Sequence, residues 1–274
     1  MQVVTSVADR TTLRGSIASL FPITLGKRAL HITSMDRVNF EALPILDFED
    51  SSHDANWLSI HASVAFSDQE RQLRKNDSKD VLLNLKDNLL SLMVTFAGVQ
   101  NVKTNVFGIY SSQGGVDTLL FVNHLRLDTS ANSIVADVCI LPMTEELILT
   151  QPVIQNYLAK ITKEKIMGAI HTADVTGEAW KQLLPVAVER CRSWSHMNNC
   201  EYSTEGRVPL TLSHSQVPIC GCGRGLALGS FSEVKVWRGL EAFVTRAAIG
   251  LLFPSSFLDT MMTLPDNGGG GNLT

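Results

Sequence analysis

Between Asp80 and Gly98 the apolar residues recur at the spacing of a helix. Leucine, methionine and phenylalanine stand three or four positions apart over residues 81–97, as in a helix that buries one face. Asp80 precedes the first turn in the position of an N-cap, and Gly98 follows the last turn as a C-cap glycine does. The pattern therefore predicts a core helix over residues 81–97.

From residue 101 to residue 141 the period of the apolar positions changes to two. Residues 104–110, 118–127 and 133–140 are rich in Val, Ile, Phe and Leu, and short turn-prone segments at 111–115 and 128–132 join them. Parallel strands need long crossover connections, so three strands joined this closely predict an antiparallel meander. We also expect strands at residues 29–33 and 58–66, and a helix end and loop in the charged run 67–80.

After residue 143 the pattern is helical again. Thr144 followed by Glu145 and Glu146 marks a helix start, and Pro152 divides or restarts that helix, which runs to about residue 163. A further helix is expected over residues 177–194. The predicted fold class is α+β, with an antiparallel β-meander packed with helices (1–143), a helical C-terminal region (144–264) and a flexible glycine-rich tail (265–274).

The composition of the chain argues against three classes of protein: disordered, nucleic-acid-binding and membrane-spanning. The chain has 274 residues, of which 45% are hydrophobic and 18% charged, with a formal net charge of −4. This hydrophobic content excludes an intrinsically disordered chain. The negative charge argues against general nucleic-acid binding. No run of about 18 apolar residues is present, so we expect no membrane helix.

The sharpest chemical signal is a cluster of cysteines. Four of the five cysteines fall between residues 191 and 222, and His196 and Cys200 form an H-x3-C pair that precedes a C-x-C pair, Cys220 and Cys222. Zn²⁺ prefers four sulfur and nitrogen ligands in a tetrahedron, which two short-spaced pairs can supply when a hairpin brings them together. We therefore predict a zinc site formed by His196, Cys200, Cys220 and Cys222. The glycines at 221, 223 and 225 allow the tight backbone that a C-x-C needs.

The sequence does not decide which residue is the fourth ligand of this cluster. Cys191 lies on the apolar face of the predicted helix, where it is either a buried thiol or an alternate ligand that completes a four-sulfur site in place of His196. His214 is a weaker substitute within the intervening loop. If all four ligands come from the protein, no position is left for water, so the metal is expected to be structural. Cys139, inside a predicted strand, is interpreted as a buried free thiol.

Several segments resemble a family of largely uncharacterised fungal proteins. The resemblance is carried by residues 184–196, 200–202, 207–210 and 218–223, and by shorter stretches at 96–100, 105–108, 125–128, 244–249 and 252–254. It implies a cysteine/histidine metal site at the positions already named, no established enzymatic activity, and a fungal protein of the cytoplasm or nucleus. Many members carry a C-terminal MYND-type zinc finger, whereas this sequence ends in a glycine-rich tail without that finger.

The leading functional hypothesis is an intracellular, non-enzymatic zinc-binding protein with an interaction or regulatory role and an unidentified protein partner. The alternative is a Cys- or Ser-dependent hydrolase or transferase, for which Cys139, Cys191, His124 and His171 are scattered candidates. A third hypothesis is nucleic-acid binding by the zinc region, favoured only by the arginines at 190, 192, 207 and 224.

Overall fold

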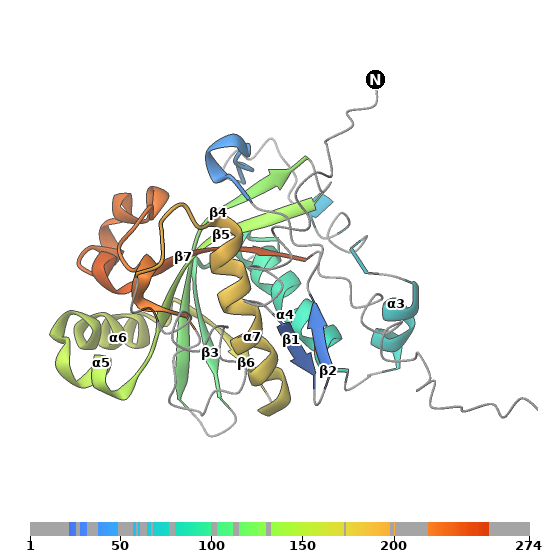
Figure 1. Ribbon diagram of the computed structural model, residues 1–274, viewed down its shortest axis with the longest axis horizontal. Helices are drawn as coiled ribbons and strands as arrows, with labels where there is room; N and C mark the ends of the chain where they lie inside the picture. The colour runs from blue at the N-terminus through green and yellow to red at the C-terminus, as the bar shows by residue number, and fades with distance from the viewer. Residues whose placement is uncertain are drawn as a thin grey trace, which may run out of the picture.

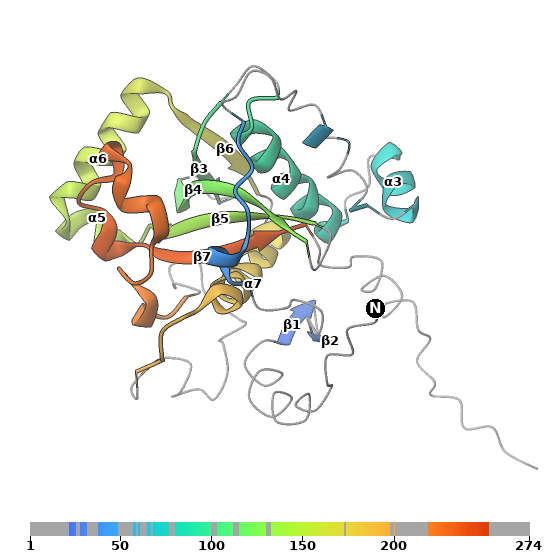
Figure 2. The ribbon, with the colours of Figure 1, turned by 90° about the horizontal axis from the view of Figure 1, so that it is seen from above.

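The structure is a computed structural model, shown in Figures 1 and 2. It describes residues 22–25, 28–31, 38–48, 57–58, 60, 65–66, 68–76, 80–99, 103–111, 115–129, 133–172, 174–197, 200 and 219–251. The expected glycine-rich tail, most of the loop that joins the two predicted ligand pairs, and His214 lie outside the described residues. Among the described residues, no helix is both long and apolar enough to cross a membrane.

Five strands form the central sheet, in the order β6-β3-β4-β5-β7. Their bounds are Val106–Tyr110 (β3), Val116–Asp128 (β4), Ser133–Pro142 (β5), Met167–His171 (β6) and Thr245–Gly250 (β7). The neighbours β3/β4, β4/β5 and β5/β7 are antiparallel, which confirms the predicted meander, while β6 runs parallel to β3. Strands β1 (Pro22–Leu25) and β2 (Arg28–His31) form a separate antiparallel hairpin. Strand β2 overlaps the strand expected at residues 29–33.

Two of the differences from the sequence prediction concern strands. Strands β6 and β7 lie in the region predicted to be helical, so the sheet crosses the expected boundary at residue 143. Strand β7 is buried at every position, and therefore has no polar alternation to reveal it. The expected strand at 58–66 is also wrong where it is described, because Leu58 and Ile60 are helical.

The helices mostly begin and end where the sequence predicts. Helix α4 spans Val81–Phe96, and the Asp80 carboxylate accepts a hydrogen bond from the Leu83 amide at 2.8 Å. Thr144 caps α5 (Glu145–Thr150) in the same way, and Pro152 begins α6 (Pro152–Glu164). The charged run forms a helix, α3 (Asp68–Lys75), rather than a helix end and loop. Helix α7 spans Asp174–Cys191 and ends three residues earlier than predicted.

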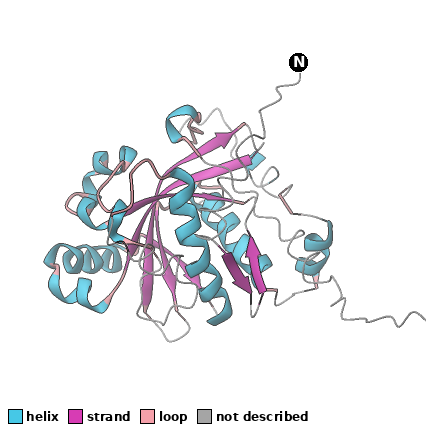
Figure 3. Cartoon of the chain, in the orientation of Figure 1, coloured by secondary structure: helices cyan, strands magenta, loops and turns pink. Residues whose placement is uncertain are grey.

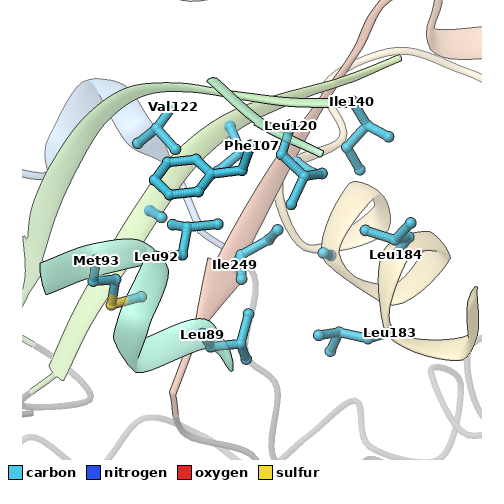
Figure 4. Close-up of a cluster of buried hydrophobic side chains, with 14 of the residues drawn as sticks. Leu89, Leu92, Met93, Phe107, Leu120, Val122, Ile140, Leu183, Leu184 and Ile249 are labelled. Atoms are coloured by element: carbon cyan, nitrogen blue, oxygen red, sulfur yellow. The ribbon is translucent and has the colours of Figure 1, made fainter. Parts of the chain in front are cut away.

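Helices cover both faces of the sheet (Figure 3). On the first face α4 and α7 lie side by side, and their leucines pack against alternate residues of β4 and β5 (Figure 4). Labelled members of that core are Leu89, Leu92, Met93, Leu120, Val122, Ile140, Leu183 and Leu184. On this face the sheet is covered by an apolar cluster that includes none of the four predicted metal ligands.

The second face is covered by α6 and by short 3-10 helices, coloured yellow-green and orange in Figure 1. These 3-10 helices are η2 (Gly221–Gly223), η3 (Gly229–Glu233), η4 (Lys235–Trp237) and η5 (Glu241–Phe243). Phe231 stacks on Trp237 with ring centroids 4.9 Å apart, and both rings pack against Phe121 of β4. The helices η3 and η4 are therefore held to the sheet by aromatic side chains.

Candidate metal centre

Four cysteine and histidine side chains come together between the end of α7 and η2. One ligand atom from each of His196, Cys200, Cys220 and Cys222 lies within 4.8 Å of every other. The Nδ1 atom of His196 is 3.5 Å from the Cys200 sulfur and 3.4 Å from the Cys220 sulfur. Such a group could hold one metal ion, and its members are the four residues that the sequence spacing predicts.

The orientation of the histidine is set by the last turn of α7. Glu189 in that turn directs one carboxylate oxygen to His196 Nε2 at 3.0 Å and the other to the guanidinium of Arg192. The Glu189 oxygen and His196 Nε2 are close enough for an ion pair, although their geometry is not that of a hydrogen bond. A carboxylate beside Nε2 favours the tautomer that carries its proton on Nε2, which leaves the Nδ1 lone pair facing the sulfurs. Histidine ligands of metals almost always donate their second ring nitrogen to such a partner, which fixes the tautomer and strengthens the ligand.

The backbone on either side of the cluster also fits thiolate sulfur. The Met197 amide donates to the Cys222 sulfur at 3.3 Å, and the Cys200 amide donates to the Met197 carbonyl at 3.0 Å. These two hydrogen bonds link Met197 both to Cys200 and to Cys222 of η2.

Close packing explains one glycine of the C-x-C segment, and backbone conformation explains another. A Cβ atom on Gly223 would lie 2.2 Å from the Trp194 indole, so this position admits no side chain without moving the indole. Gly225 has a φ of +73°, which favours glycine. Gly221 has neither constraint, since its nearest non-neighbouring atoms would be 3.9 Å from an added Cβ.

Burial keeps the sulfurs of this cluster neutral unless a cation is bound between them. The side chains of Cys200, Cys220 and Cys222 are only 1%, 4% and 7% exposed. Burial and the neighbouring sulfurs raise the pKa of the Cys220 thiol above its ordinary value. A bound divalent cation reverses this effect, because it stabilises the deprotonated ligands directly. The donor set and its burial therefore fit a metal ion.

Cys191 lies in a different environment. Its thiol lies 3.5 Å from the carbonyl oxygens of Val188 and Arg246, and it packs with Val38, Phe40, Val135 and Ala248. Burial raises the pKa of this thiol to about 12. The geometry thus favours His196 over Cys191 as the fourth member of the cluster.

The scattered nucleophile candidates do not form one site. Cys139 is fully buried on β5, and burial raises the pKa of its thiol. His171 lies on the edge strand β6, stacked on Tyr110. A reactive cysteine needs a lowered pKa. The raised pKa of the Cys139 and Cys191 thiols therefore argues against a nucleophilic role for either residue. His124 has a different partner, the Ser230 hydroxyl, which sequence reasoning did not single out.

The arginines near the cluster are mostly engaged within the protein. Arg190 is buried and donates to the Ala248 carbonyl, and Arg192 pairs with Glu189. Arg224 is exposed, while Arg207 lies outside the described residues. The described part of this region therefore offers little of the clustered positive charge that phosphate binding requires.

Comparisons with protein families, with curated proteins and with solved structures find no match to this chain. The resemblance to fungal proteins associated with a MYND-type finger therefore stays a prediction.

Proposed function

We propose that this chain is a zinc-binding protein in which a closed Cys3His site has a structural role. The observation that carries the proposal is the convergence of the three sulfurs and His196 Nδ1, with the Glu189 carboxylate 3.0 Å from the opposite nitrogen of the ring. Three thiolates with one imidazole favour zinc over magnesium or calcium, which prefer oxygen ligands. With four protein ligands, no coordination position is left for a reacting water.

Zinc at this position would join the end of α7 to η2. These two elements meet through the Trp194–Gly223 contact and the Met197–Cys222 hydrogen bond. A metal ion bound to residues from both sides would add a direct link to these contacts. We propose a non-enzymatic role for this site in interaction with a protein partner or in regulation, in the cytoplasm or nucleus, where thiolates stay reduced.

Elemental analysis of the purified protein tests the proposal. We expect one zinc per chain, and loss of that zinc when Cys220 and Cys222 are both replaced by Ser. Cys191→Ser is the matched control, because it removes a thiol that lies outside the cluster and keeps a hydroxyl able to contact the same carbonyls. Absence of zinc from the wild-type protein, or equal loss of zinc in Cys191→Ser, would overturn the proposal.

A further inference from the structure

A β-bulge in β4 turns His124 towards the second face of the sheet. Before the bulge, Leu120 and Val122 point to the core beneath α4 and α7. The register with β5 shifts between Val122 and His124, so Asn123 is the extra residue. A bulge places the residues after it on the opposite face from the one that strict alternation would give. His124 thereby faces η3, on the side of the sheet that also carries Phe121.

Polar contacts hold the bulge in place. The Asn123 side-chain amide donates to Asp137 at 3.4 Å and to the Leu228 carbonyl at 3.3 Å. Asp137, fully buried on β5, is paired with the guanidinium groups of Arg126 and Arg246. This network ties the bulge directly to the residue that precedes η3, which makes the position of His124 relative to η3 a built feature of the fold.

Gly229 brings the next residue of η3 close to that histidine. Its φ is +61°, and an added Cβ would lie 2.5 Å from the Arg246 guanidinium. A side chain at this position would therefore push η3 away from the sheet. With glycine there, Ser230 Oγ lies 2.9 Å from His124 Nε2, although the two residues are 106 positions apart in sequence.

The surroundings of His124 suit proton acceptance. Burial lowers the pKa of His124 below its ordinary 6.5; Asp137 and Glu233 raise it in part, and Arg126 and Arg246 lower it further. The imidazole is therefore neutral at pH 7. Its Nε2 can accept the hydrogen of the serine hydroxyl when Nδ1 carries the ring proton. Both side chains are only half-buried, so they are not sealed from solvent.

We propose that Ser230 is an acyl-accepting nucleophile and that His124 is its general base, in a site for carboxylic esters separate from the metal centre. Ser230 Oγ attacks the ester carbonyl carbon while its proton passes to His124 Nε2, and the carbonyl π pair moves to oxygen. Collapse of this adduct breaks the bond to the alcohol, which leaves with the proton from His124. Attack by water on the acyl-serine, with His124 again taking a proton, releases the acid and restores the hydroxyl.

A fluorophosphonate probe tests the pair in the full-length protein. The reaction forms a bond from Ser230 Oγ to phosphorus and expels fluoride, so intact mass spectrometry should show one adduct and peptide mapping should place it at Ser230. Ser230→Ala should abolish labelling. Ser232→Ala should not, because this serine is exposed two residues further along η3 and has no histidine partner among the described residues.

The role of the base has its own readout. His124→Gln should slow labelling about 100-fold or more, as loss of a general base does. Since only neutral His124 accepts the proton, labelling should be at its full rate at pH 7 and fall as the pH drops below the lowered pKa. Circular dichroism spectra that match wild type show that the variants are folded. Absence of an adduct at Ser230 in the wild-type protein, or equal labelling of folded His124→Gln, would overturn the proposal.

Discussion

Removing the carboxylate behind the histidine should weaken metal binding without removing any ligand. Glu189 is only 9% exposed at its side chain and lies 3.0 Å from His196 Nε2. Glu189→Gln keeps an acceptor of nearly the same shape but removes the charge, whereas Glu189→Ala removes both. In the alanine variant the imidazole loses the partner that fixes its tautomer and its ring orientation.

The magnitude follows from what such partners contribute elsewhere. Loss of an outer hydrogen-bond partner of a metal-bound histidine costs about 10–100-fold in affinity, which corresponds to about 1.4–2.7 kcal/mol. We expect Glu189→Gln near the lower end of this range and Glu189→Ala near the upper end. Competition for zinc against a chromophoric chelator of known affinity measures both constants, with all proteins reduced and at the same pH.

Glu145→Gln supplies the control, because Glu145 is an exposed acid at the start of α5. It has the same change in net charge and should leave the zinc affinity unchanged. The reasoning is refuted if Glu189→Ala binds zinc as tightly as wild type does. An equal loss in Glu145→Gln would show that net charge, and not the carboxylate beside His196, causes the effect.

Three further outcomes test the packing around the centre and in the sheet. Gly223→Ala should destabilise the protein by about 1–3 kcal/mol in urea unfolding and weaken zinc binding, because its Cβ would overlap the Trp194 indole. Gly221→Ala should do neither, because the nearest non-neighbouring atoms would be 3.9 Å from its Cβ. Equal effects of the two substitutions would contradict this account. Asp137→Ala should lower the free energy of unfolding by about 3–5 kcal/mol, because two buried guanidinium groups lose their partner. The side chain of Asp68 is 93% exposed, so Asp68→Ala should lower it by less than about 0.5 kcal/mol. Iodoacetamide at pH 8 should modify Cys200, Cys220 and Cys222 only after zinc is chelated. It should leave Cys139 and Cys191 unmodified in both states, since the pKa of each thiol is raised. Mass spectrometry of the labelled peptides measures this, and labelling of Cys139 or Cys191 in the folded protein would contradict the raised pKa values.

Local signals in the sequence predicted a large part of the fold. The N-cap at Asp80 and the cap at Thr144 act within three residues, so they do not depend on tertiary contacts. The meander followed from short connections, which permit only antiparallel pairing. The grouping of His196, Cys200, Cys220 and Cys222 was predictable because metal ligands come in short-spaced pairs.

The remaining features depend on contacts between distant segments. Strand β6 is five residues long, includes Gly168 and Ala169, and pairs with β3 in the parallel sense. It therefore lacks both the alternation and the short hairpin that marked the meander. Strand β7 is buried at every position, so its pattern does not distinguish it from a buried helix.

The supporting residues of the two sites were hidden for a similar reason. Glu189 precedes His196 by seven residues, and only the end of α7 after Cys191 lets the chain turn back towards it. The Ser230–His124 pair requires a bulge at Asn123 and the close approach of Gly229 to Arg246. Neither leaves a periodic signal in the sequence, although the glycine before Ser230 is a visible sign of a close approach.

The central claim is a Cys3His zinc site, and X-ray absorption at the zinc K-edge tests it most directly. For the purified full-length protein the account predicts one zinc per chain with three sulfur neighbours at about 2.3 Å and one nitrogen neighbour at about 2.0–2.1 Å. Replacement of His196 by Ala should remove the nitrogen contribution and leave the three sulfurs. A four-sulfur shell, a shell dominated by oxygen, or protein that holds no zinc would contradict the account.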